Sequence, residues 1–283
     1  MIKQAIIPLA GLGTRLLPLT SVFAKELLPI NGKPGIEYIL DECIEAGITE
    51  IIFIISKKKE MIKNYFYNDE FYKSLIKKKK DPRIIKEYKK ILKYKKKIKF
   101  VYQNKPLGTG DAVLKTKKFI KNKYFLMLLP DDLIMKRNCS KDMIKLHKKY
   151  KASVMASMSV KKNNVNRWGI YSLSKKLDNQ NFIISDVIEK PNTREAPSNN
   201  AVIGRYILNK NIFKILKKQK KGKGGEIHIT DSIKTMIDNK SLFIGHKFSG
   251  KYLDCGSMSG YINSTLEIAK LWKYVWLVQA MLG

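Results

Sequence analysis

The sequence predicts an α/β protein built on a doubly wound, mixed but mainly parallel sheet, with a small β-rich insert and a C-terminal helix. Three observations support this class. Apolar segments of strand length alternate with segments of helical periodicity over residues 2–160. Segments such as EIIFII at 50–55 show almost no polar alternation, as in strands that are covered on both faces. Glycine loops and acidic pairs follow the strand ends, where such sheets bind ligands.

The first half supplies the parallel part of this sheet. The segment 36–46 has apolar residues at helical spacing and stops at Gly47, a typical C-terminal cap. The lysine-rich stretch 57–99 has similar spacing, which predicts one or two amphipathic helices with a solvated lysine face. The alternation of strands and helices in this half is typical of a Rossmann-like fold. We expect strands at 2–9, 50–55, 98–103, 124–129 and 152–160, and further helices at 111–119 and 140–150.

The second half of the sequence does not show a regular alternation of strands and helices. WGIYSLS and FIISDVIEKP predict two strands of a hairpin-like insert. No internal repeat or Pro/Ser-rich linker divides the chain, so we expect one continuous domain. A terminal helix at about 258–283 includes the apolar residues Trp272, Tyr274 and Trp276. The remaining patterns predict strands at 201–209 and 241–248, helices at 211–218 and 230–238, and a strand end at YLDCGS.

Composition excludes a disordered chain and argues against a nucleic-acid-binding protein. Hydrophobic residues make up 44% of the 283 residues, enough for a substantial core. The 56 Lys+Arg against 24 Asp+Glu give a net charge of +32, which raises the idea of a polyanionic partner. However, only 6 of these basic residues are arginine, which nucleic-acid readers favour. Residue types with AT-rich codons dominate, so we interpret the charge as compositional drift. A basic nucleic-acid-binding protein is the alternative from another class.

The cysteines and the apolar segments indicate the cellular compartment in which the protein is expected. Cys43, Cys139 and Cys255 are too few and too scattered for a disulfide framework or a zinc site, which fits a reducing cytoplasm. No uncharged apolar run reaches the roughly 18 residues of a membrane span. The N-terminus lacks the basic region and cleavage site of a signal peptide. We therefore expect a cytoplasmic protein.

The first loop gives the strongest chemical signal. Gly11 and Gly13 follow the first strand, where a glycine backbone can approach a phosphate or a base. Arg15 and Lys25 add two cations, which a triphosphate with a leaving pyrophosphate requires. The loop lacks the G-K-[ST] ending of a Walker A loop and the third glycine of the dinucleotide fingerprint.

Acidic residues close two later strands. Asp131 and Asp132 follow YFLMLLP, and Asp254 lies in YLDCG. Carboxylates at a strand end can hold Mg²⁺, which prefers oxygen ligands. Taken alone, the Asp131-Asp132 pair fits a turn or a helix cap better than a metal site.

At these residues the chain resembles a known family. AGLGTRLLPLT…AKELLPINGKP is similar to the signature of the sugar-1-phosphate nucleotidyltransferases. The likeness is strongest to bacterial members that use UTP and glucose 1-phosphate. It implies the nucleotide-diphospho-sugar transferase fold as one domain over 1–283, with a nucleotide-binding half at about 1–135, a sugar-phosphate-binding half at about 136–257 and a C-terminal helix at about 258–283. Between about residues 3 and 270 it includes ECIEAGITEIIFI, PLGTGDAVL, LLPDD, VIEKP, APSNNAVIGRYIL, GGEIHITDSI and YLDCGSMSGY.

The resemblance implies a role for each candidate residue. Arg15 and Lys25 would stabilise charge on the departing pyrophosphate, and Lys190 would hold the attacking phosphate. Asp131 and Asp254 would jointly bind the catalytic Mg²⁺, with Asp132 only an accessory candidate. The nucleotide would contact Ala10, Gly11, Gly13, Gln103 and Gly108, and the sugar would contact Gly169, Glu189, Val202 and Gly204.

Two positions leave alternatives open. Asp111 stands in LGTGD where the family usually has histidine, which leaves open how strictly uracil is preferred over thymine. Glu189 and Lys190 could also form an ordinary ion pair at an exposed strand end.

The implied reaction transfers uridylyl from UTP to α-D-glucose 1-phosphate and gives UDP-glucose and pyrophosphate. It is an Mg²⁺-dependent in-line attack without a covalent intermediate. The expected partners are these two small molecules, with no nucleic acid and no membrane, and relatives suggest a homodimer or homotetramer. Within the family, the alternatives are thymidylyl transfer, another sugar phosphate, and an inactive regulatory paralogue.

Overall fold

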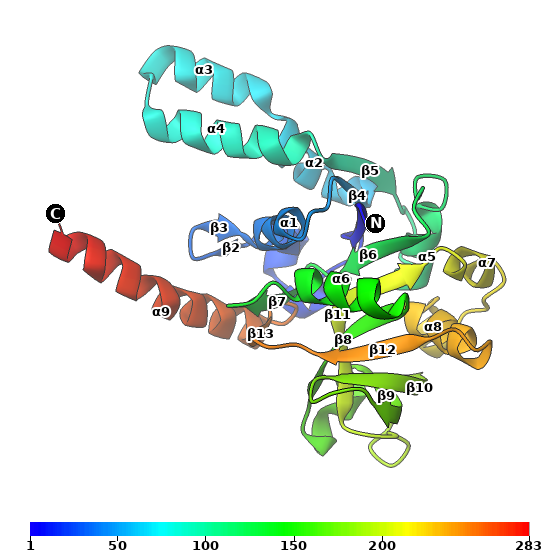
Figure 1. Ribbon diagram of the computed structural model, residues 1–283. Helices are drawn as coiled ribbons and strands as arrows, with labels where there is room; N and C mark the ends of the chain where they lie inside the picture. The colour runs from blue at the N-terminus through cyan, green and yellow to red at the C-terminus, as the bar shows by residue number, and fades with distance from the viewer. Residues whose placement is uncertain (283) are drawn as a thin grey trace.

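The computed structural model describes the backbone of residues 1–282 and the side chains of all these residues except 223 and 272–282. Its main element is a nine-stranded sheet with the order β5-β4-β1-β6-β11-β8-β12-β10-β9 (Figure 1). The first four strands in this order are parallel, as predicted. They are β5 (Ile98–Tyr102), β4 (Glu50–Ile55), β1 (Gln4–Pro8) and β6 (Tyr124–Leu128).

Helices cover both faces of the sheet, which confirms the doubly wound α/β prediction. In β4, Phe53 belongs to one hydrophobic core and its neighbour Ile52 to the other, because successive side chains point to opposite faces. The first core is closed by α1 (Gly35–Glu45), α2 (Glu60–Tyr67) and α6 (Cys139–Tyr150). The second is closed by α5 (Thr109–Lys115), α7 (Ile212–Leu216) and α8 (Ile229–Asp238).

The sheet is mixed, as predicted, but it is not mainly parallel, because most pairs in its second half are antiparallel. β11 runs antiparallel to both of its neighbours, β6 and β8. Only β12 and β8 pair in parallel there. The strands of this half are β8 (Ser153–Ser159), β9 (Gly169–Lys176), β10 (Asn181–Glu189), β11 (Asn200–Asn209) and β12 (Phe243–Lys247).

The expected β-rich insert is part of the main sheet. β10 pairs with β12, and β9 returns to β11 through Ala201 and Ile170, so the five strands form a closed ring. Tyr171 packs inside this ring, where its side chain is fully buried and its hydroxyl lies 2.7 Å from Ser157 Oγ of β8. Its ring fills the space beside Gly245, where a Cβ would lie only 3.0 Å away.

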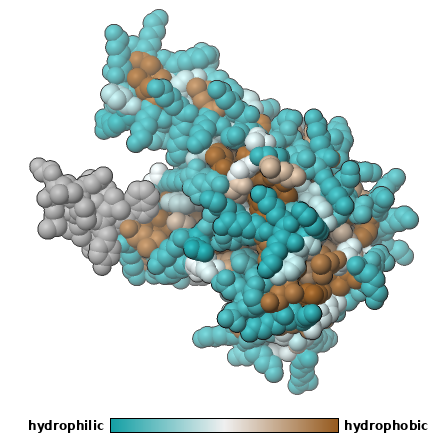
Figure 2. All heavy atoms as spheres, viewed as in Figure 1, coloured by the Kyte–Doolittle hydropathy of each residue, from teal (hydrophilic) through white to brown (hydrophobic). Residues whose placement is uncertain are grey.

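Two helical elements project from this body. The lysine-rich segment is helical, as predicted, but it forms three helices instead of one or two: α2 and then a hairpin of α3 (Asp69–Lys79) and α4 (Pro82–Lys95) (Figure 1). The hairpin surface is largely hydrophilic (Figure 2). The long α9 (Met258–Leu282) confirms the predicted terminal helix, although the side chains of Trp272, Tyr274 and Trp276 lie outside the described residues. Within the described residues, no helix is both long enough and apolar enough to cross a membrane.

Two small ribbons complete the fold. One pairs β2 (Pro29–Ile30) with β3 (Lys33–Pro34). The other pairs β7 (Asp132–Met135) with β13 (Lys251–Asp254) and brings residue 254 opposite residue 132. The sequence patterns did not predict β7, whose pairing partner lies more than a hundred residues away along the chain.

Candidate functional site

The loop after β1 carries the predicted glycines and cations to the sheet edge. Gly13 has a φ of +71°, a left-handed conformation that favours glycine, and precedes the short turn Thr14–Leu16. Its carbonyl accepts a hydrogen bond of 2.8 Å from Thr20 Oγ1, which fixes the loop. A Cβ on Gly11 would have no neighbour within 4 Å, so that side of its backbone is accessible. Ala10 is buried and anchors the start of the loop.

Asp131, shortly after β6, is the centre of a charge cluster. Its Oδ2 lies 2.7 Å from Lys25 Nζ and 3.7 Å from Arg15 Nη2. The Lys25 side chain is only 14% exposed, whereas that of Arg15 is 62% exposed. Lys25 is therefore a fixed cation, and Arg15 is free to reach toward a ligand.

The electrostatics of this pair favour its charged form. Burial acts to lower the pKa of Lys25, but the carboxylates of Asp131 and Glu26 outweigh this effect and raise it. Burial acts to raise the pKa of Asp131, but Lys25 outweighs it, so the pKa is lowered. The structure thus holds an ammonium and a carboxylate together at neutral pH.

The second predicted acid arrives from β13. The amide of Cys255 donates a hydrogen bond of 2.7 Å to the carbonyl of Asp131, which ties the two acid-bearing segments together. A Cβ on Gly256 would lie 2.6 Å from Asp131 Oδ2, 2.8 Å from Arg15 Nη2 and 3.2 Å from Asp254 Oδ1. Both carboxylates and the guanidinium therefore converge on the space that this glycine leaves open. Sequence reasoning missed Gly256, although a glycine directly after YLDC was a visible signal.

Arg167 was also missed. Its Nη2 lies 2.9 Å from Asp254 Oδ2, and its guanidinium stacks 4.8 Å from the centre of the Trp168 ring. The signal was its residue type, since only six arginines occur in this lysine-rich chain. Arg15 and Arg167 thus each approach one of the two acids.

The two residues predicted for the base lie together at the end of β5. Gln103 is 5% exposed, and its Nε2 donates hydrogen bonds to Asp111 Oδ2 at 2.8 Å and to the Gly108 carbonyl at 3.1 Å. Gly108 has a φ of +99°, and a Cβ there would lie 2.6 Å from the carbonyl oxygen of Ile227. Only glycine fits at this point of the loop.

The residues predicted for the sugar meet at the paired ends of β9 and β10. Gly169 lies opposite Glu189, and a Cβ on it would lie 3.4 Å from Glu189 Oε2. Lys190 Nζ lies 3.6 Å from Glu189 Oε1, so the ordinary ion pair of the alternative interpretation is present. Thr230 Oγ1 donates a hydrogen bond of 2.7 Å to Glu189 Oε2, a contact that sequence reasoning did not identify.

Val202 and Gly204 lie on β11, between these groups. Val202 is buried. The Gly204 amide donates to Asp132 Oδ2 at 2.9 Å, and its carbonyl accepts from the Leu129 amide at 2.8 Å. A Cβ on Gly204 would lie 2.4 Å from Asp132 Oδ2 and 2.5 Å from Leu129 Cβ, so packing against the segment between β6 and β7 already requires this glycine. Contact of Gly204 with a sugar stays a prediction.

A buried ion pair contacts the chain segment that carries Asp131 and Asp132. Arg205 of β11 is 0% exposed, and its Nη2 and Nε lie 2.8 Å and 3.0 Å from the two carboxylate oxygens of Glu42. Its Nη2 also donates to the Asp132 carbonyl at 2.7 Å. Arg205 therefore links α1, β11 and the start of β7.

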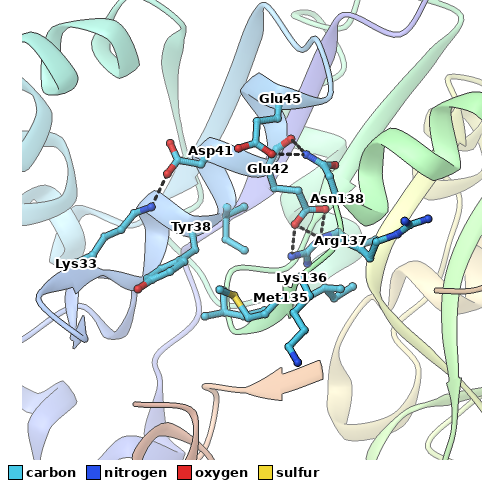
Figure 3. A pocket seen from close by; sticks show the side chains of 13 residues that line it. Lys33, Tyr38, Asp41, Glu42, Glu45, Met135, Lys136, Arg137 and Asn138 are labelled. Atoms are coloured by element: carbon cyan, nitrogen blue, oxygen red, sulfur yellow. Dashed lines mark hydrogen bonds and ion pairs between the residues drawn. The ribbon is translucent and has the colours of Figure 1, made fainter. Parts of the chain in front are cut away.

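A cavity of about 360 Å³ is lined in part by this pair and lies between α1 and β7 with the segment that follows it (Figure 3). Two pairs of its charged side chains form ion pairs, Lys33 with Asp41 and Arg205 with Glu42. Asn138 donates to Glu45 Oε2 at 3.2 Å. None of the predicted site residues lines this cavity, so it is separate from the candidate site.

Asp132 differs from its neighbour Asp131. It accepts hydrogen bonds from Tyr252 Oη at 2.6 Å and from the Gly204 amide. Burial, together with the charge of Asp131, raises the pKa of Asp132 to about 6. Its ionised form is therefore the disfavoured form in the folded protein.

We predict that Asp132→Asn stabilises the protein above pH 6 and has little effect near pH 4. Because the pKa is raised on folding, the contribution of the protonated carboxyl to stability is complete below pH 3.8 and is lost as the pH rises toward 6. The asparagine can still accept from the Gly204 amide and donate to Tyr252. Urea unfolding of both proteins from pH 4 to 8 measures the difference, and an equal stability gain at every pH would contradict this account.

Comparison with known proteins agrees with the family resemblance seen in the sequence. Residues 4–270 match the family model described as "Nucleotidyl transferase". UTP–glucose-1-phosphate uridylyltransferase 2 of Streptococcus pyogenes is 35% identical over 273 residues, which are 95% of this chain and 90% of that protein.

Two solved structures are also similar. A UDP-glucose pyrophosphorylase complexed with UDP-glucose has a TM-score of 0.84 and 36% identity, over 95% of this chain and 99% of that one. A UTP-bound UGPase from Acinetobacter baumannii has a TM-score of 0.83 and 32% identity, over 95% of this chain and 93% of that one.

Proposed function

This chain belongs to the nucleotidyl transferase family, and we propose that it transfers the uridylyl group of UTP to α-D-glucose 1-phosphate, giving UDP-glucose and pyrophosphate. The observation that carries this proposal is the convergence of Asp131, Asp254 and Arg15 on Gly256, beside Lys25 and the glycine loop. This arrangement offers cations for a leaving pyrophosphate and carboxylates for a metal ion.

We propose Mg²⁺ as the cofactor, held by Asp131 and Asp254. The donors fit such a hard cation, because both are carboxylates and Gly256 adds no side chain between them. Lys25 outweighs the effect of burial and leaves Asp131 with a lowered pKa. When bound, the ion supplies charge neutralisation where the two phosphate groups meet.

The protein groups have to align two anions and offset their repulsion. An oxygen of the sugar phosphate forms a bond to the α-phosphorus as the bond from that phosphorus to the pyrophosphate oxygen breaks. The nucleophile is already ionised at neutral pH, so no covalent enzyme intermediate is needed. Lys190 holds the attacking phosphate, while Lys25 and the exposed Arg15 stabilise the pyrophosphate.

The remaining residues bind the rest of the substrates. Backbone of Ala10, Gly11 and Gly13 contacts the nucleotide, with Gln103 and Gly108 at the base. Glu189 accepts hydrogen bonds from the sugar hydroxyls, with Gly169, Val202 and Gly204 around the ring. A homodimer or homotetramer in the cytoplasm stays our prediction for the assembly.

A substrate panel tests this function. We expect release of pyrophosphate with UTP and glucose 1-phosphate in the presence of Mg²⁺, and much less with ATP or GTP. Each nucleoside triphosphate, dTTP included, is combined with glucose 1-phosphate, galactose 1-phosphate and mannose 1-phosphate, and pyrophosphate is measured. A clear preference for dTTP would favour the thymidylyl alternative. No release with any pair would favour the inactive paralogue.

A further inference from the structure

Asp111 has no role in the function proposed above, yet its carboxylate is buried against the residue that is to read the base. The side chain is 7% exposed and comes from the first turn of α5. Its Oδ2 accepts the 2.8 Å hydrogen bond from Gln103 Nε2. Its other oxygen, Oδ1, lies 3.5 Å from Lys115 Nζ on the following turn of the same helix.

The two partners of Gln103 Nε2 determine which way its amide faces. A carboxylate and a main-chain carbonyl have no proton to donate, so each can pair only with the NH₂ end of the amide. Asp111 Oδ2 and the Gly108 carbonyl are both such acceptors. A flipped amide would place Oε1 against both of them and lose both hydrogen bonds. The orientation is therefore fixed by chemistry and not by an arbitrary assignment of oxygen and nitrogen.

This orientation leaves one polar atom of Gln103 for a ligand. Within the described residues, Oε1 of Gln103 accepts no hydrogen bond, and the Gly108 amide donates none. The loop thus presents an acceptor from Gln103 and a donor from Gly108 close together. Uracil and thymine carry an N–H donor at N3 next to a carbonyl acceptor. Cytosine carries an acceptor at N3 and an amino donor at position 4, so its pattern does not match.

We propose that Asp111 is a positioning residue that fixes the Gln103 amide with Oε1 toward the nucleotide and thereby excludes cytosine in favour of bases with an N–H at N3. The proposal rests on the proposed function, in which Gln103 and Gly108 contact the base. Asp111 does not touch the nucleotide itself. Rejection is effective because a mismatched base leaves buried polar groups unpaired.

The test compares kcat/KM for UTP and for CTP in the wild type and in two variants. Asp111→Asn keeps the shape but offers an NH₂ group that can pair with a flipped Gln103, so the ratio of UTP to CTP should fall about tenfold. Asp111→Ala removes one acceptor and adds no donor, and the Gly108 carbonyl still favours the original orientation. Its ratio should lie between those of the wild type and Asp111→Asn.

Lys115→Met is the matched control. It removes the other partner of Asp111, on the exposed side of α5, and leaves the contact with Gln103 intact. Its ratio should equal that of the wild type. Urea unfolding midpoints confirm that each variant is folded, and CTP binding by calorimetry gives a readout that does not depend on turnover.

The outcomes separate the two proposals. If the wild type releases no pyrophosphate with UTP and glucose 1-phosphate, the proposed function fails. If the wild type is active but both folded Asp111 variants lose activity equally with UTP and CTP, Asp111 is merely structural and the positioning role is overturned. An unchanged ratio with unchanged activity overturns it as well.

Discussion

Asp131→Asn is expected to lower turnover with UTP and glucose 1-phosphate by at least about a hundredfold while the protein stays folded. Lys25 and Arg15 both approach the carboxylate of Asp131. Asp254 lies near it across the space that Gly256 leaves open. The variant keeps the volume and an oxygen but removes the charge that holds Lys25 and that would bind a divalent cation. Steady-state pyrophosphate release at saturating substrates measures the effect.

Asp132→Asn is the matched control, since it makes the same change one residue along the chain. Asp132 binds Tyr252 and Gly204 and is not aimed at Gly256. We expect its turnover to stay within a few fold of the wild type. Near wild-type turnover in Asp131→Asn would rule out our assignment of the metal and pyrophosphate site, whereas equal losses in both variants would show that the change acts through folding of this strand end.

Arg205→Met is expected to have the largest effect on stability, a loss of about 3–5 kcal/mol. The variant leaves the buried carboxylate of Glu42 without its cation and removes the donor to the Asp132 carbonyl. An uncompensated charge on a largely buried carboxylate is costly, because it has lost most of its hydration and its ion-pair partner. The free energy of unfolding in urea measures this loss.

Lys99→Met provides the comparison on the surface. Lys99 is 53% exposed and pairs with Glu50 at 2.9 Å. Exposed pairs contribute only about 0–1 kcal/mol, so this variant should be close to the wild type. A loss in Arg205→Met no larger than that in Lys99→Met would contradict our view that the Arg205–Glu42 pair holds α1 against the acidic strand end.

Local patterns explain which parts of the fold could be predicted. β4 and β1 are short apolar segments, β1 is followed by a glycine loop and β4 is preceded by Gly47, and α1 has a clear helical repeat that stops before Gly47, so each element carries its own signal. The return of β9 to β11 pairs Ile170 with Ala201, and Tyr171 contacts Ser157 of β8, so these contacts join strands that are not neighbours in sequence. No local pattern specifies such a pairing.

In the candidate site too, residues with a local sequence signal could be predicted, and residues defined by distant contacts could not. Arg15, Lys25 and Asp131 come from motifs with a recognisable composition, and the structure brings them together as ion pairs. Gly256 was missed because its role depends on Asp131 and Arg15, which approach it from distant segments, as well as on its near neighbour Asp254. Asp111 was noted only as a departure from the family, since its contact with Gln103 becomes visible only when α5 is placed beside β5.

The closed ring of strands also bears on how the protein resists aggregation. Because β9 pairs with β11 as well as with β10, the main sheet is left with an open edge at β5. An unpaired strand edge can act as a template for a strand from another molecule, and charged side chains on that edge oppose such pairing. β5 carries Lys99, and the lysine-covered hairpin of α3 and α4 precedes it directly in the chain. The lysine excess, which takes little part in the proposed chemistry, thus places positive charge where intermolecular β-pairing would otherwise begin.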